Sequence, residues 1–250
     1  MTVYVERNIN MIRLDKFLSE MGLGTRSEVK KLIKTGQIAI NGTVAAKPET
    51  KVDTDADEVS VNGRIVKYQR YEYYLFNKPS GCVSATCDNV HDTVMDYITD
   101  AVHDDLFPVG RLDIDTEGLL LITNDGALSH ELLSPSKHVA KTYYARIDGE
   151  VTLDDIIRFK EGIDIGEERP TKPAELVIKK SGSVSEIELT ITEGKFHQVK
   201  RMFEALGKWV IYLQRISMGP LKLPDDLKTG TYRALTQAET DMLMQIKSGK

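Results

Sequence analysis

The sequence predicts an α+β fold in two domains, a small N-terminal α/β domain over residues 11–67 and a larger domain over residues 71–247. Two amphipathic helix patterns followed by short strands occupy the first domain. From Tyr71 onward strands and helices follow one another without regular alternation, which is typical of a mainly antiparallel sheet. A chain of 250 residues is long enough to build a core in each domain.

Two helices open the N-terminal domain. The first is expected to end at Gly22 or Gly24, and its apolar stripe at near-helical spacing consists of Ile12, Leu14, Phe17, Leu18 and Met21. Thr25-Arg26-Ser27-Glu28 has the pattern of a capping box, which opens a second helix. Gly36 is expected to end that helix.

Short strands complete this domain. Residues 37–40 and 43–44 are joined by Asn41-Gly42, a strong signal for a two-residue hairpin turn. A further strand is expected at residues 58–61. The domain boundary is expected at residues 67–70.

The larger domain mixes strands and helices. Apolar or alternating runs predict strands at residues 73–79, 119–123, 141–147, 185–191 and 209–213. Helices are expected at residues 93–98, 127–133 and 152–161, from Glu193 to about Leu206, and after Thr236.

Charge is segregated along the chain. The net charge of −5, taken alone, argues mildly against a nucleic-acid partner, but phosphate binding depends on where the charge lies. Acidic residues cluster at residues 53–58, 100–105 and 161–168. The basic residues of the predicted helix pair are Arg13, Lys16, Arg26, Lys30, Lys31 and Lys34. Arg26, Lys30 and Lys34 step by four residues and share one helix face. Such a face is more often merely solvated than a binding surface, and the pattern alone leaves both interpretations open.

Composition argues against several classes of protein. No apolar run approaches the roughly 20 residues of a membrane span, so no membrane contact is expected. Residues 1–10 indicate a short disordered or loosely packed arm without a signal segment, and we therefore expect a cytoplasmic protein. Cys82 and Cys87 have neither zinc-pair spacing nor the number needed for a disulfide framework, and the histidines are scattered. No metal site is expected.

The most informative segment is the loop at residues 110–118, Gly-Arg-Leu-Asp-Ile-Asp-Thr-Glu-Gly, which runs into the strand expected at residues 119–123. Loops held by a rigid scaffold often carry catalytic side chains, although an arbitrary acidic loop is more often a solvated turn. This loop resembles the catalytic loop of pseudouridine synthases, most closely those of the RsuA type, which act on ribosomal RNA. In that family the aspartate after Arg-Leu is catalytic, which here is Asp113.

Two further segments carry the resemblance, Lys141-Thr142-Tyr143 and residues 194–202. It extends over residues 12–247 and implies a long mixed central sheet crossed by a cleft. By the resemblance, Tyr143 places its ring against the target base, and Lys200 is the basic partner of Asp113. Arg201 is the less favoured candidate for that partner and is otherwise expected to bind RNA.

The N-terminal domain resembles a small RNA-binding domain first seen in a small-subunit ribosomal protein. The resemblance rests on residues 13–18, Arg26-Ser27 and Ile40-Asn41-Gly42. That domain binds structured RNA through its helix pair, with Arg and Lys as phosphate clamps. By this resemblance the RNA contacts are Arg13, Lys16, Arg26, Lys30, Lys31 and Lys34, which position RNA without reading much sequence.

The implied reaction cuts the bond from ribose to the uracil ring nitrogen, turns the uracil and rejoins it through a ring carbon. Nothing is oxidised and no group is gained, so no cofactor is expected. Asp113 could act as a nucleophile on the sugar or the base, or as a base toward the ribose 2′ proton, and the sequence leaves these roles open. The target nucleotide has to flip out of its stack to be reached.

Residues beside these three positions have less specific roles. Arg111 either fills the vacated stack or holds a phosphate, or else forms a salt bridge with Asp115 or Glu117, and both interpretations remain open. His197 and Gln198 are expected to order the cleft rather than to catalyse, because nothing in this chemistry requires a general-acid histidine.

The leading hypothesis is therefore a monomeric isomerase acting on one uridine of ribosomal RNA, free or in a pre-ribosomal particle. By analogy alone, the motifs favour small-subunit over large-subunit rRNA. A second hypothesis is a non-catalytic RNA-binding or ribosome-assembly factor with the same fold. A third is an aspartate-dependent hydrolase, which would need a second carboxylate across a cleft, such as Asp115.

Overall fold

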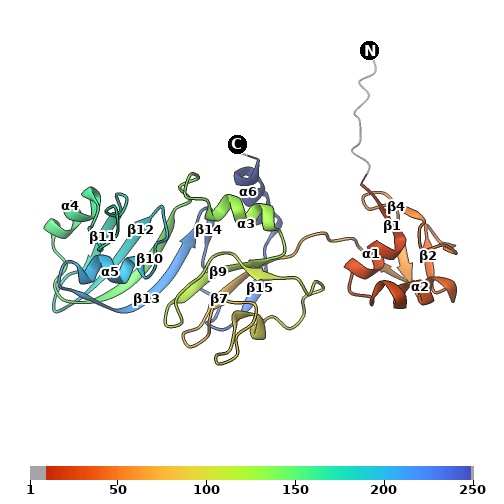
Figure 1. Cartoon of the computed structure of the whole chain (residues 1–250), viewed down its shortest axis with the longest axis horizontal. Coiled ribbons are helices and arrows are strands. Elements are labelled where there is room, and N and C mark those ends of the chain that lie inside the picture. Colours follow the sequence, from red (N-terminus) through yellow and green to blue (C-terminus); the bar gives the residue numbers. More distant parts are fainter. Residues whose placement is uncertain (1–9, 249–250) are drawn as a thin grey trace, which may run out of the picture. The chain divides into compact units, whose positions relative to one another are not determined.

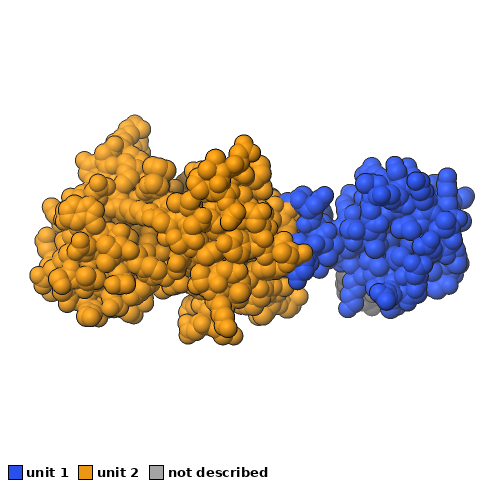
Figure 2. Space-filling view, turned by 90° about the horizontal axis from the view of Figure 1, so that it is seen from below, with its two compact units in different colours: residues 1–72, 100–105 blue, residues 73–99, 106–250 orange. Residues whose placement is uncertain are grey.

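The computed structural model describes residues 10–248, so the N-terminal arm expected at residues 1–10 lies, except for Asn10, outside the described residues. The chain divides into two compact units (Figure 2). The first consists of residues up to Glu72 together with Asp100–Asp105, and the second of Tyr73–Thr99 and the chain from Leu106 onward. Each unit has a hydrophobic core of its own.

The first unit combines two short helices with small sheets (Figure 1). Its helices are α1 (Leu14–Glu20) and α2 (Arg26–Lys34). Antiparallel strands form a sheet in the order β3-β2-β5-β6, with the bounds Thr43–Val44, Ile38–Ile40, Val59–Val61 and Arg64–Val66. A separate pair joins β1 (Met11–Arg13) to β4 (Lys51–Asp53). Phe17, Val29 and Val52 are fully buried in the shared core.

The second helix begins as predicted, whereas the first begins later than expected. At α2 the Thr25 hydroxyl accepts a hydrogen bond from the Glu28 amide, and the Glu28 carboxylate accepts one from the Thr25 amide at 2.8 Å. The prediction that Ile12 belongs to the first helix was wrong. Ile12 lies opposite Val52 in the β1–β4 pair, and this ladder satisfies its backbone in place of helical bonds.

The second unit is built on a nine-stranded sheet with the main order β11-β12-β10-β13-β9-β7-β15 (Figure 1). In that order the strands are Glu175–Lys180, Val184–Ile191, Lys141–Asp148, Trp209–Met218, Glu117–Thr123, Tyr73–Lys78 and Tyr232–Ala234. Two short strands lie off this path, β8 (Phe107–Pro108) beside β9 and β14 (Leu221–Lys222) beside β13. Every pair is antiparallel except β9 with β13, so the expected α+β fold with a mainly antiparallel sheet is confirmed.

Helices cover this sheet in two groups (Figure 1). The helices α3 (Gly126–Leu133) and α6 (Gln237–Lys247) pack against each other. The helix α4 (Leu153–Glu161) packs on β11, and α5 (Gln198–Glu204) on β13. A short 3₁₀ helix occupies Val94–Tyr97. Within residues 10–248, no helix combines the length and the apolar character needed to cross a bilayer.

The parallel contact between β9 and β13 depends on a glycine. Gly118 adopts a φ of +100°, and a Cβ built there would lie 2.3 Å from the Arg215 carbonyl oxygen. Glycine therefore lets the two backbones approach where the loop at residues 110–118 enters the sheet.

Some elements differ from the predictions. The helix expected from Glu193 begins only at Gln198, because His197 adopts a left-handed conformation with a φ of +46° and residues 194–197 form a loop. The strands missed in the sequence are short or exposed: Met11–Arg13, Lys51–Asp53, Arg64–Val66, Phe107–Pro108, Glu175–Lys180, Leu221–Lys222 and Tyr232–Ala234.

Candidate active site

The loop at residues 110–118 is held in place through its backbone. The Lys78 ammonium group, at the end of β7, lies 3.1 Å from the Asp113 carbonyl oxygen and 3.2 Å from that of Ile114. The same group lies 3.0 Å from the carbonyl oxygens of Pro79 and Thr116. Lys78 is fully buried, and this burial lowers the pKa of its ammonium group. Sequence reasoning had placed Lys78 in a strand and given it no role.

A second set of contacts fixes the same loop. The Ser84 hydroxyl donates to the Leu112 carbonyl oxygen and accepts from the Leu112 amide, both at 3.0 Å. The Gly81 amide donates to the Ile114 carbonyl oxygen at 2.7 Å. Hydrogen bonds from residues 78–84 thus hold the main chain of the loop both before and after Asp113.

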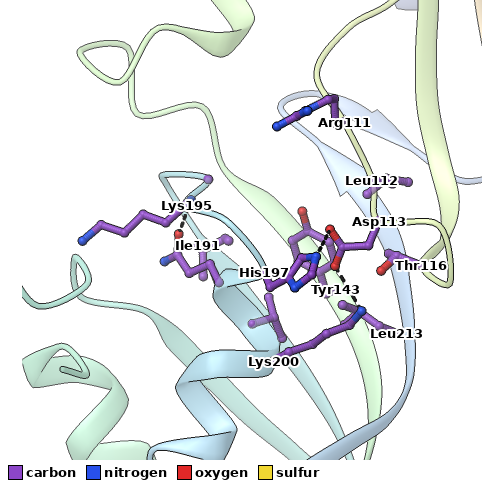
Figure 3. A pocket seen from close by; sticks show the side chains of 13 residues that line it. Arg111, Leu112, Asp113, Thr116, Tyr143, Ile191, Lys195, His197, Lys200 and Leu213 are labelled. Atoms are coloured by element: carbon purple, nitrogen blue, oxygen red, sulfur yellow. Dashed lines mark hydrogen bonds and ion pairs between the residues drawn. The ribbon is translucent and has the colours of Figure 1, made fainter. Parts of the chain in front are cut away.

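Lys200 meets the Asp113 side chain from α5, as the resemblance implied. Its Nζ lies 3.1 Å from Asp113 Oδ2 (Figure 3). The same Nζ lies 2.6 Å from Asp115 Oδ1. Burial alone would lower the pKa of Lys200, but the hydrogen bonds to Asp115 and Asp113 outweigh it and raise the pKa. The helix that carries Lys200 is anchored by buried Val199, Met202 and Phe203.

Asp115 lies beside Asp113 rather than opposite to it. Burial alone would raise the pKa of Asp115. The hydrogen bond and the charge interaction with Lys200 together outweigh burial, so the pKa of Asp115 is lowered. Both carboxylates share one cation, which is not the arrangement of two carboxylates poised across a cleft for hydrolysis.

His197 also contacts the Asp113 side chain, which the sequence had not predicted. Its Nε2 lies 3.6 Å from Asp113 Oδ1 (Figure 3). The left-handed backbone of His197 is the feature that turns the chain into α5, and this conformation has no clear signal in the sequence. The neighbouring Gln198 orders the loop, because its side chain accepts from the Lys195 amide at 2.8 Å and donates to Glu193 at 2.9 Å.

A cavity of 640 Å³ adjoins these side chains, and Asp113, Tyr143 and His197 all contribute to its lining. Tyr143 is buried on β10, where it pairs with Leu189 of β12 and Arg215 of β13. The cavity has the size of a small-molecule site and lies over the middle of the sheet. A carboxylate beside an ammonium group and an aromatic ring can act there as a nucleophile or a base on a flat ring substrate.

The two arginines expected to bind RNA differ in their surroundings. Arg111 is exposed, lines the cavity and points away from Asp113 in Figure 3, and it forms no ion pair with any described residue. The salt bridge considered for Arg111 is therefore absent from the described part of the chain. Arg201 donates to Glu167 at 2.7 Å and to the Phe196 carbonyl oxygen at 3.1 Å. Lys200, not Arg201, is the residue next to Asp113.

The six basic residues of the N-terminal unit that were predicted to contact RNA are all exposed. Arg13 forms a two-bonded pair with Asp15, and Lys16 lies 3.5 Å from Glu20. The other four lie on α2 and form no ion pair within residues 10–248: Arg26, Lys30, Lys31 and Lys34. The helix therefore presents unneutralised positive charge to solvent.

No cluster of three or more His, Cys, Asp and Glu side chains suited to a metal ion occurs among the described residues. Cys82 is a buried free thiol and Cys87 an exposed one. The site as described consists of Asp113, Lys200, Tyr143 and His197.

The chain matches the family model of RNA pseudouridylate synthases over residues 72–205 and the S4 domain model over residues 12–59. An uncharacterized RNA pseudouridine synthase of Bacillus subtilis (strain 168) is 46% identical over 234 residues, which cover 93% of this chain and 98% of that protein. Ribosomal small subunit pseudouridine synthase A of Haemophilus influenzae is 38% identical over 237 residues, covering 94% and 100%. A crystal structure of a pseudouridylate synthase superposes with a TM-score of 0.66 at 38% identity, covering 93% and 99%.

The sequence had left open a hydrolase and a non-catalytic RNA-binding factor, and these matches support neither of them. The synthase model spans more than half of the chain, and the relatives align over nearly their whole length. The chain belongs to the RNA pseudouridylate synthase family and is an RNA pseudouridine synthase, an isomerase with an N-terminal S4 domain.

Proposed function

We propose that this enzyme isomerises one uridine of small-subunit ribosomal RNA, with Asp113 as the reacting carboxylate. The observation that carries the proposal is the 3.1 Å ion pair between Lys200 and Asp113, whose side chain lines the cavity. The relative from Haemophilus influenzae is a small-subunit synthase by name, and this supports small-subunit rather than large-subunit rRNA. A ribosomal RNA substrate would place the enzyme in the cytoplasm, on free rRNA or on a pre-ribosomal particle.

The reaction conserves the atoms of the nucleotide, apart from exchange of one proton. The bond between ribose C1′ and uracil N1 breaks, a bond between C1′ and C5 forms, and the C5 hydrogen leaves as a proton while N1 gains one. Asp113 initiates this by attack on the nucleotide or by removal of the ribose 2′ proton. In either role its carboxylate lies beside the Lys200 ammonium group, and removing that cation would leave a half-buried charge without its partner.

Tyr143 is proposed to hold the detached uracil. Its ring lines the same cavity as Asp113 and is itself buried, so it offers a fixed flat surface. Stacking of a base on an aromatic side chain contributes about 1–3 kcal/mol, enough to keep the uracil in the cavity while it turns.

The target nucleotide has to leave its stack to reach Asp113. Arg111 is proposed to contact the RNA during this step, either in the vacated stack or on a phosphate. Its exposure on the cavity lining and its lack of an ion pair with described residues support this role. Arg201, which is engaged with Glu167, is proposed as a more peripheral RNA contact.

The two domains are proposed to divide the work, with residues 11–67 binding RNA and residues 71–247 carrying out the reaction. The S4 match at residues 12–59 and the exposed cations of α2 support the first assignment. All side chains of the candidate site come from one chain, and we therefore expect a monomer to be active.

Carbodiimide mapping of pseudouridine in rRNA tests the proposal. Cells lacking the protein should lose one modification in small-subunit rRNA, and wild type should restore it whereas Asp113→Asn should not. Loss of a site in large-subunit rRNA would contradict the substrate assignment. Restoration by Asp113→Asn would contradict the role of Asp113.

A further inference from the structure

Phe196 is an aromatic side chain that remains 68% exposed at the cavity. Single exposed apolar residues are common and need no explanation by themselves. Ile114 and Leu133 are also exposed and line the 640 Å³ cavity, but among the described residues Phe196 is the one exposed aromatic side chain in that lining, which it shares with Asp113, Tyr143 and His197.

The Phe196 ring continues the site outward. It stacks on the His197 imidazole with ring centroids 3.8 Å apart and an interplanar angle of 20°. His197 Nε2 in turn lies 3.6 Å from Asp113 Oδ1. Two stacked rings therefore lead from the Asp113 carboxylate toward solvent. Because Phe196 is exposed, much of its ring surface is accessible to a ligand.

The loop that carries Phe196 is fixed by hydrogen bonds. The Phe196 carbonyl oxygen accepts from Arg201 at 3.1 Å. On the preceding residue, the Lys195 amide donates to Gln198 at 2.8 Å and the Lys195 ammonium group to the Arg169 carbonyl oxygen at 2.8 Å. A ring held in place before binding loses little conformational freedom when it is covered, which favours a recognition role.

The side chains around the ring indicate the partner. Four basic residues line the same cavity, Arg111, Lys141, Lys195 and Arg215, against three acidic ones, Asp88, Asp113 and Glu193. An exposed aromatic ring among cations is the arrangement that binds single-stranded nucleic acid, where bases stack on rings and phosphates meet the charges.

We propose that Phe196 stacks on a nucleobase adjacent to the target uridine and so holds the unstacked strand open beside Asp113. The proposal rests on the proposed function, because it takes the RNA as the substrate. It assigns Phe196 to substrate positioning and gives it no part in the bond-making steps.

The first test uses a small-subunit rRNA transcript labelled with tritium at uridine C5, since the reaction releases that hydrogen. Phe196→Tyr and Phe196→Trp keep a stacking surface, whereas Phe196→Leu keeps only apolar area and Phe196→Ala neither. The Leu and Ala variants should raise KM roughly 5- to 150-fold, with kcat changed less, and the aromatic variants should stay near wild type. Leu153→Ala is the matched control, because Leu153 is 75% exposed on α4 and does not line the cavity.

The second test reads stacking directly. The sequence contains a single tryptophan, so Phe196→Trp in a Trp209→Phe background places the only indole at the cavity. Adding the transcript should quench its fluorescence, with a midpoint that matches filter binding of the same RNA. Unchanged emission while RNA is bound would overturn the proposal. The ring would then serve only as an apolar contact within the protein.

The two proposals fail in different ways. If wild type releases no tritium from the transcript, the proposed substrate is wrong, and the fluorescence test alone decides the role of Phe196. If wild type releases tritium and Phe196→Ala matches it in KM, the stacking proposal is wrong and the proposed function stands.

Discussion

The Lys78 ammonium group lies 3.1 Å from the main-chain carbonyl oxygen of Asp113, so a buried cation positions the proposed reacting residue through its backbone. Lysine is among the residues least often buried without a charged partner. Here four carbonyl oxygens take that place, three of them from the loop at residues 110–118. The cation gathers these carbonyls at one point, which defines the curvature of the loop.

Lys78→Met should therefore impair both stability and catalysis. Hydrogen bonds to a charged group contribute about 1.5–3 kcal/mol each, but burial of the ammonium group offsets part of that, and we expect a loss of about 2–4 kcal/mol in urea unfolding. The value of kcat should fall more than KM rises, because Asp113 is displaced while the RNA contacts remain. Lys208→Met, which removes the 2.6 Å pair with Asp155 away from the cavity, is the control. It should lower stability without lowering kcat of the folded enzyme, and equal kcat losses in both variants would contradict the positioning role.

Asp113→Asn should abolish activity and leave the fold intact. The amide keeps the shape of the carboxylate but is neither a nucleophile nor a base, so kcat should fall by at least about 1,000-fold. Lys200 keeps Asp115 at 2.6 Å and is not left unpaired, so unfolding should shift by less than about 1 kcal/mol. Tritium release and urea unfolding check both points. Asp115→Asn removes the other carboxylate and should reduce kcat far less. A similar loss in the two variants would mean that the carboxylates act as a pair.

Local signals explain which elements the sequence predicts well. The capping box at Thr25 and the alternation at residues 185–191 involve neighbours in the chain, and both elements occur in the structure. The loop at residues 110–118 was recognisable from its amino-acid sequence, and Lys200 was found by its position in the segment at residues 194–202. Their 3.1 Å contact joins residues 87 positions apart only through the fold.

Features that depend on distant parts of the chain were missed. Lys78 binds carbonyl groups 35 to 38 residues away, and carbonyls leave no trace in a sequence. The strand at Glu175–Lys180 is an edge strand with charged, exposed positions, so its alternation is weak. The late start of α5 depends on His197 in a left-handed conformation, which glycine would have indicated much more strongly than histidine does.

Lys141 should make stability depend on pH in the alkaline range. Burial, with a smaller contribution from Arg215, lowers the pKa of Lys141 to about 8 from an ordinary value of 10.5. Between these values the unfolded chain binds more protons than the folded one, so folding becomes more favourable as pH rises through about 8.

The comparison of wild type with Lys141→Met isolates this effect. The difference in unfolding free energy between wild type and the variant should change by about 2 kcal/mol in favour of wild type from pH 7.5 to pH 9.5. This change does not depend on the size of the difference at pH 7.5. Urea unfolding at half-unit pH steps measures the difference. A difference that stays constant with pH would show that Lys141 keeps its ordinary pKa, and a falling one would show that it is raised.

The exposed cations of α2 should set the salt dependence of RNA binding. Arg26, Lys30, Lys31 and Lys34 form no ion pair within residues 10–248 and are free to meet phosphates. Lys30→Glu combined with Lys34→Glu should weaken binding of a small-subunit rRNA transcript and reduce the slope of log Kd against log salt by about 2, because each phosphate contact contributes about 0.9. Thermal unfolding should be nearly unchanged, since both side chains are exposed.

A matched pair of substitutions separates this helix from charge in general. Lys47→Glu with Lys51→Glu makes the same change of charge on exposed positions of the same unit, outside α2. If α2 is the contact face, this control should retain most of the wild-type salt slope, because long-range attraction depends on net charge whereas counterion release depends on the phosphates contacted. Equal slopes in the two double variants would mean that α2 contributes no more to RNA binding than other exposed cations of the unit. A slope unchanged from wild type in Lys30→Glu with Lys34→Glu would exclude both residues as phosphate contacts.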